Sequence, residues 1–250
     1  MNILQMMMGA CGVEEITWEN WDETSEATLA SDDIFVCLME NVNAGGDETG
    51  RGGGLTGADL VLTQTGNIAG MSDGHRTLDG TDDYFTVTTA FLDALIANVN
   101  NTWTIILKVD NITLNTDDYF LFLNSEPVNT NAFSSSITAT DKYQMTTYQN
   151  SSYDIVTTTD SLQAATEYYI CIWADGTDMR MGFTTTRPTK WSDFGENDRV
   201  LFGTNTGAFS GLTFDHATYR TFFSAAGTGC LAADFYYMVM SKTCLIDNDL

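Results

Sequence analysis

The sequence predicts an all-β protein built as an antiparallel β-sandwich, and three observations support this. Short apolar or alternating runs, such as residues 34–40 and 102–109, are separated by polar turns rich in Asp, Asn and Gly. Thr is abundant and Pro occurs only twice, as expected of half-buried strands. The 250 residues are 43% apolar and 12% aromatic, so the chain can bury a sizeable core.

Residues 76–109 give the clearest order of elements. A strand-like run ends at the acidic turn 79–83, and an alternating run follows over residues 84–89. Residues 90–99 carry apolar side chains at helical spacing, with Thr89 as the expected N-cap, before a Trp-led strand at 102–109. This stretch therefore predicts two strands, a short helix and a central strand.

The rest of the chain continues the β pattern without an internal repeat or a linker. Further strands are expected at residues 34–40, 58–65, 119–124, 133–138, 143–149, 153–157, 167–174, 179–184, 200–204, 212–214, 218–223 and 232–240. The first and last of these should pair, which places residues 32–250 in one domain.

The last strand is apolar on both faces. Strict alternation puts Tyr236, Met238 and Met240 on one face, and Tyr237 and its neighbours on the other. A sandwich strand with one wet face would alternate apolar and polar residues. The outer face of at least one sheet is therefore expected to be covered by the N-terminal arm, a neighbouring subunit or a ligand.

Residues 1–31 form a separate N-terminal arm. No Lys or Arg precedes Arg51, so the positive region of a signal peptide is missing and we expect an uncleaved arm. Its apolar side chains suggest attachment to a partner or oligomerisation, while packing on the arm's own domain is the alternative. The residues expected to make the attachment are Met6, Met7, Met8, Trp18 and Trp21.

The run LDGTDDY at residues 78–84 and the hairpin EYYICIWADG at 167–176 carry a family resemblance. They resemble the LDG-DDY core and the ADG hairpin of laminin-G-like domains, within the concanavalin A-like lectin/glucanase superfamily. The resemblance covers residues 33–250. It implies a concanavalin A-like jelly roll with a short helical segment, preceded here by the arm.

Hydrolases of the resembled superfamily carry a pair of carboxylates on one strand. The nearest candidate, Glu19 to Glu23, has the wrong spacing and lies in the arm, while the expected central strands hold almost no acids. His75 and His216 lie in no catalytic motif and are interpreted as structural. We therefore expect a protein that is not an enzyme.

Acidic residues gather in turns that contain Gly. Asp79, Asp82 and Asp83 occupy one such turn, and Asp175 and Asp178 occupy another. Oxygen ligands on loops are what calcium takes, so Asp82, Asp83, Asp175 and Asp178 are the candidate calcium ligands. The alternative is that these residues only shape their turns.

Charge and cysteines narrow the choice of partner and compartment. The formal net charge of −24 repels phosphate backbones, so nucleic acid is not expected as a partner, and no apolar run is long enough for a membrane helix. Cys37 and Cys171 lie in strand-like runs and are expected to be buried. Cys230 and Cys244 bracket the last strand, and either pair in an oxidising compartment or stay free.

Laminin-G-like domains that follow a short Met-rich arm resemble structural proteins of tailed-phage virions. The resemblance implies a non-enzymatic virion surface protein, in capsid decoration, a head fibre or the tail, with a lectin-like domain for host-surface glycans. Its partners would be other virion proteins, copies of itself and a cell-surface glycan. The alternatives are an extracellular bacterial carbohydrate-binding module and a polysaccharide hydrolase or lyase of the same fold.

Overall fold

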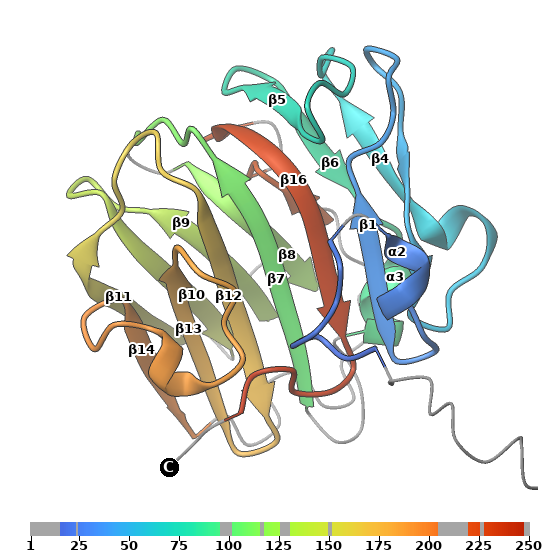
Figure 1. Ribbon diagram of the computed structural model, residues 1–250. Helices are drawn as coiled ribbons and strands as arrows, with labels where there is room; N and C mark the ends of the chain where they lie inside the picture. The colour runs from blue at the N-terminus through green and yellow to red at the C-terminus, as the bar shows by residue number, and fades with distance from the viewer. Residues whose placement is uncertain are drawn as a thin grey trace, which may run out of the picture.

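Two antiparallel β-sheets pack face to face to form the protein (Figure 1). The structure, a computed structural model, describes residues 16–23, 25–95, 102–115, 118–125, 131–149, 152–204, 220–225 and 228–247. The strand order is β14-β13-β12-β7-β16-β1-β3 in the first sheet, with β5 also paired to β16, and β11-β10-β9-β8-β15-β6-β4-β2 in the second. The predicted all-β antiparallel sandwich is confirmed.

The strands of the first sheet are β1 (Ile34–Leu38), β3 (Arg51–Gly52), β5 (Arg76–Asp79), β7 (Thr102–Asp110), β12 (Tyr168–Asp175), β13 (Asp178–Thr184), β14 (Arg199–Thr204) and β16 (Ala232–Ser241). Those of the second are β2 (Glu48–Thr49), β4 (Val61–Thr65), β6 (Tyr84–Thr86), β8 (Tyr119–Ser125), β9 (Asn131–Ile137), β10 (Lys142–Gln149), β11 (Ser152–Ser161) and β15 (Arg220–Phe222). The short helices are α2 (Glu26–Leu29), α3 (Thr89–Leu95) and the 3-10 helices η1 (Gly57–Leu60) and η2 (Trp191–Asp193). Within the described ranges, no helix has the length and apolar character needed to span a membrane.

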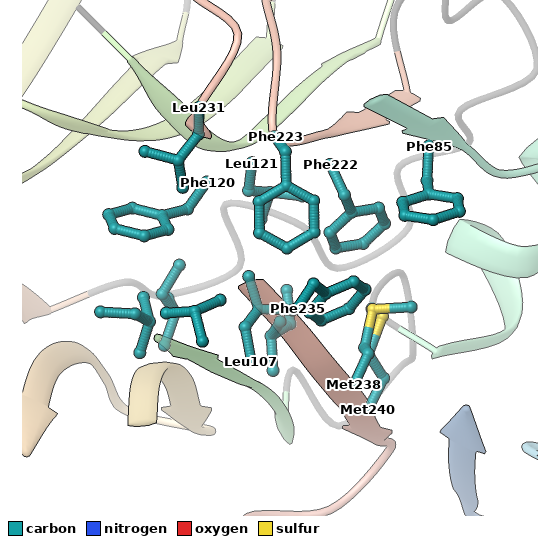
Figure 2. Close-up of a cluster of buried hydrophobic side chains, with 14 of the residues drawn as sticks. Phe85, Leu107, Phe120, Leu121, Phe222, Phe223, Leu231, Phe235, Met238 and Met240 are labelled. Atoms are coloured by element: carbon teal, nitrogen blue, oxygen red, sulfur yellow. The ribbon is translucent and has the colours of Figure 1, made fainter. Parts of the chain in front are cut away.

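The main core lies between the two sheets. Figure 2 shows Phe85, Phe120 and Phe222 of the second sheet facing Phe235 and Met238 of the first. Trp103 of β7 belongs to this core and is fully buried, as predicted. The first and last predicted strands, β1 and β16, pair antiparallel, which confirms that they belong to one sheet.

A second apolar cluster covers the outer face of the first sheet. Trp173 of β12 is fully buried there beneath Trp191 and Phe194, with ring centroids 5.5 and 5.3 Å away. The N-terminal segment around Trp18 and the C-terminal Ile246 belong to the same cluster. The predicted cover of an outer face is therefore present, and it comes from segments of this chain.

Local details differ from the predictions at the helices. The N-cap of α3 is Thr88, not Thr89, because the Thr88 hydroxyl accepts the Phe91 N–H at 3.1 Å. The strand expected at 58–65 starts as the 3-10 helix η1 and becomes extended only at Val61. The strand expected at 212–214 lies outside the described residues.

The described cysteines are unpaired. Cys37 and Cys171 are buried, as predicted. Cys230 and Cys244 are free because they lie beyond opposite ends of β16, whose 10 residues span about 33 Å. A disulfide needs Cα atoms within about 7 Å, so the alternative in which these two residues pair is wrong.

Candidate functional site

A β-bulge in β16 puts two consecutive tyrosines on the outer face of the first sheet. In the pairing with β7, Phe235 stands opposite Val109 and Tyr237 opposite Lys108, so Tyr236 is an extra residue. Phe235 points into the main core, whereas Tyr236 and Tyr237 both pack on the outer cluster. The strict alternation expected from the sequence, with Tyr236 on the face of the inward methionines, is therefore wrong at this point.

The two tyrosines line a groove of about 380 Å³. Tyr236 is half-buried and Tyr237 is buried. Four segments that are distant in the sequence converge here: the N-terminal segment, the end of β1 with the residues after it, the loop 66–75 and β16. Their contributions to the wall are Glu23, Leu38, Met39, Glu40, Met71, Gly74, Tyr236 and Tyr237.

A fully buried arginine, Arg76 at the start of β5, holds the loop wall of the groove. Its guanidinium donates to the carbonyls of Ile68 and Ala69, both at 2.9 Å, and to Glu48 Oε1 at 3.0 Å. Glu48 also accepts the backbone N–H of Glu40 at 3.1 Å, and Glu40 lines the groove from the segment after β1. One buried ion pair therefore fixes the loop wall and this segment relative to each other.

The tip of the loop is a tight hairpin. Ser72 and His75 exchange backbone hydrogen bonds, and the central residues Asp73 and Gly74 have φ of 52° and 80°. Positive φ at both central positions defines a type I′ turn, which Asp-Gly favours. The turn places Gly74 in the groove wall and brings the His75 ring to 5.2 Å from that of Tyr236.

Glu23 holds the N-terminal segment against the sheet. Its carboxylate accepts hydrogen bonds from Lys108 Nζ at 2.8 Å, Arg187 Nη2 at 2.7 Å and the Tyr169 hydroxyl at 2.8 Å. Burial opposes ionisation, but these three donors outweigh it and lower the pKa of Glu23 to about 2. Glu23 is therefore a fixed negative charge in the groove wall at every pH near neutrality.

Lys108 brings an ammonium group beneath the tyrosines. Its Nζ lies 5.4 Å from the ring centroid of Tyr236, 5.8 Å from Tyr237 and 5.6 Å from Tyr169. It also contacts the carboxylates of Glu23 and Glu167, at 2.8 and 3.4 Å. This surface of the protein thus already holds one ammonium between aromatic rings and carboxylates.

The two tryptophans expected to attach to a partner pack instead on their own domain. Trp18 and Trp21 are 3% and 2% exposed, and their indole N–H groups donate to the carbonyls of Pro188 at 2.6 Å and Ser25 at 2.8 Å. The Arg187 guanidinium lies over both rings. Almost no surface of either side chain is left for a partner. Trp18 and Trp21 therefore pack on their own domain, which was the alternative interpretation of the sequence. The expected attachment residues Met6, Met7 and Met8 lie outside the described residues.

The candidate calcium residues fall into two separate groups. Asp79, Asp82 and Asp83 each place a carboxylate oxygen within 4.8 Å of the others. Asp83 is buried, and its two oxygens accept the backbone N–H groups of Asn67 at 3.1 Å and Asp79 at 3.0 Å. These bonds shape the turn, and they leave Asp79 and Asp82 exposed beside it.

Asp175 and Asp178 face an arginine of their own hairpin. Arg180 Nη1 contacts Asp175 Oδ2, and Nη2 lies 3.2 Å from Asp178 Oδ2. The second Asp175 oxygen accepts the N–H groups of Thr177 and Asp178, both at 2.8 Å. The guanidinium occupies the place that a cation would need, so these two carboxylates do not suit calcium and the sequence interpretation is corrected there.

The groove joins aromatic rings with carboxylates. Aromatic faces pack on the C–H faces of sugar rings, and ionised carboxylates accept hydrogen bonds from hydroxyl or amino groups. The sequence identified neither Tyr236 nor Glu40 as site residues, because the bulge and the loop contacts that bring them together leave no local pattern in the chain.

No family model and no curated protein matches this sequence. Solved structures with a similar fold include domain 4 of AbnA, a GH43 extracellular arabinanase from Geobacillus stearothermophilus, in complex with arabinotriose. That domain is 14% identical, with a TM-score of 0.53 over 73% of this chain and 79% of the domain.

Two further matches are parts of much longer chains. The Trypanosoma rangeli sialidase is 10% identical, with a TM-score of 0.54 over 84% of this chain and 31% of the sialidase. The binding domain of botulinum neurotoxin DC, in complex with rat synaptotagmin II, is 11% identical, with a TM-score of 0.53 over 86% of this chain and 49% of that one. At these identities the likeness shows the fold alone, a β-sandwich.

Proposed function

We propose that this protein is a non-enzymatic, glycan-binding β-sandwich displayed on a virion surface, and that its groove beside Tyr236 receives the sugar. The observation that carries the binding role is the β16 bulge, which puts Tyr236 and Tyr237 together in one groove with Glu23 and Glu40. A ring beside fixed acceptors is the combination that a sugar needs for stacking and orientation. The AbnA domain, which shares the fold, is in complex with arabinotriose.

The state of Glu23 supports binding rather than hydrolysis. A glycosidase needs one carboxyl group whose raised pKa lets it donate a proton and a second that attacks or activates water. Glu23 has the opposite character, because its lowered pKa and three hydrogen-bond donors keep it ionised and engaged. It can accept a hydrogen bond from a ligand but is a poor proton donor.

The virion placement rests on the sequence. The resemblance of residues 33–250 to laminin-G-like domains, with a Met-rich arm before them, is typical of structural proteins of tailed phages. The charge of −24 suits an exposed, soluble surface. In this proposal residues 1–15 contact other virion proteins or further copies of the chain, and the sandwich faces the cell. Immunogold labelling of purified particles tests it, and label found only in the particle-free medium would favour the extracellular module.

A glycan array tests the binding role. Labelled wild-type protein should bind a defined subset of glycans, and Tyr236→Ala should weaken binding at least about tenfold, the equivalent of about 1.4 kcal/mol. Tyr84→Ala is the matched control, since Tyr84 is a half-buried tyrosine of β6 in the other sheet. Absence of binding to every glycan, or equal loss in both folded variants, would contradict the proposal.

A further inference from the structure

The groove lies in a strongly acidic part of the surface. Glu23 and Glu40 line it. Burial raises the pKa of the Tyr236 hydroxyl, and the nearby carboxylates of Asp110, Glu167 and Asp234 raise it further. Five carboxylates therefore surround the two tyrosines.

The cations of this surface are already engaged by those carboxylates. Lys108 contacts Glu23 at 2.8 Å and Glu167 at 3.4 Å, and Arg187 donates to Glu23 at 2.7 Å. Within the part of the chain that the structure describes, no cation pairs with Glu40, which is exposed. A ligand in the groove thus meets an excess of negative charge.

We propose that the groove selects glycans that carry a free amino group, such as unacetylated hexosamines, over neutral glycans, and that it rejects anionic glycans. This inference rests on the proposed function and names the ligand class of the same site. The ammonium of the sugar would lie between Glu40 and the face of Tyr236. Lys108 shows that this surface accommodates such a group, since its ammonium lies between tyrosine rings and carboxylates on the same sheet.

Charge also excludes the opposite ligand class. A sialic acid, uronic acid or sulfated sugar would bring a further negative charge close to Glu23 and Glu40. Proteins bind such groups with an arginine or lysine whose charge is not already paired, and no arginine or lysine is among the residues that line the groove. At separations of about 5 Å, near a protein surface, each like-charge contact costs about tenfold or more in affinity. The binding affinity should therefore fall steeply from glycans with a free amino group to neutral glycans and again to anionic glycans.

Calorimetric titration with three probes of equal length tests the inference. A tetramer of β-1,4-linked glucosamine should bind at least about tenfold more tightly than the N-acetylated tetramer at low salt, and a tetramer of galacturonic acid should not bind. Added salt should narrow the difference between the first two, because it screens charges at a solvent-exposed site. The Glu40→Gln variant should reduce the amino-to-acetyl affinity ratio several-fold, whereas Glu196→Gln, a neutralised exposed residue before β14, should leave that ratio unchanged.

The outcomes separate the two proposals. If none of the tetramers and no glycan of the array binds, the proposed function fails, and this inference fails with it. If glycans bind through Tyr236 but the acetylated or anionic tetramer binds as well as the glucosamine tetramer, the inference alone is overturned. If the glucosamine preference is unaffected by both Tyr236→Ala and Glu40→Gln, it reflects the overall charge of −24 rather than the groove, which also overturns the inference.

Discussion

Glu23→Gln tests whether one carboxylate holds the N-terminal segment on the sheet. The ordinary pKa of 4.5 falls to about 2 in the folded protein, and this difference corresponds to about 3 kcal/mol of stabilisation at neutral pH. Because the side chain is 27% exposed, solvent screening reduces the expected loss to about 2 kcal/mol. Urea unfolding followed by tryptophan fluorescence measures it.

The pH dependence of that loss is the sharper readout. A carboxyl group whose pKa is lowered by folding stabilises the protein fully above its unfolded pKa, and the contribution disappears as the pH falls from about 4.5 to about 2. The wild type should therefore exceed Glu23→Gln in stability at pH 7 and converge with it near pH 2. Glu19→Gln, in the same segment but exposed, should parallel the wild type. Parallel profiles for wild type and Glu23→Gln would refute the reasoning.

Three other predictions concern the core, calcium and the arm. Trp103→Ala should lower the free energy of unfolding by about 3 to 5 kcal/mol, and a loss below about 1 kcal/mol would mean that β7 is misplaced. Millimolar calcium should raise the melting temperature of the wild type but not that of Asp82→Asn, and EDTA should reverse the rise. If calcium does not change the melting temperature of the wild type, the aspartates of residues 79–83 only shape their turn. Deleting residues 1–15 should abolish assembly or attachment without lowering the melting temperature, whereas deleting residues 1–31 should lower it because Trp21 is buried. Unchanged assembly after the shorter deletion would remove the attachment role.

The fold was predictable because its signals are local. Alternation and short apolar runs located the central strands, and the fully buried side chains of Trp103 and Trp173 fall on strands that the sequence indicated. What alternation did not reveal is that Trp173 belongs to a second cluster on the outer face, since a residue covered by η2 and a residue between two sheets look alike in sequence.

The candidate site was not predictable for a different reason. Tyr236 and Tyr237 share the outer face only because β16 contains one residue more than its partner β7 at that point, and the choice of where to bulge is made by pairing across the sheet. The Arg76–Glu48 pair that fixes the groove walls joins residues 28 positions apart. Likewise, Asp175 and Asp178 looked equivalent to Asp82 and Asp83 until the structure placed Arg180 between them.

Glu23 couples the N-terminal segment to the groove, and this coupling is itself testable. The same carboxylate that binds Lys108 and Arg187 lines the ligand groove, so a sugar that contacts Glu23 binds only the protein whose segment is docked. Linkage is reciprocal: a ligand that favours the docked state must make docking more favourable by the same factor. Hydrogen exchange should therefore slow in residues 16–23 when a bound glycan saturates the groove, while exchange in the remote hairpin of β10 and β11 stays unchanged. Binding without added protection of residues 16–23 would show that the sugar does not contact Glu23.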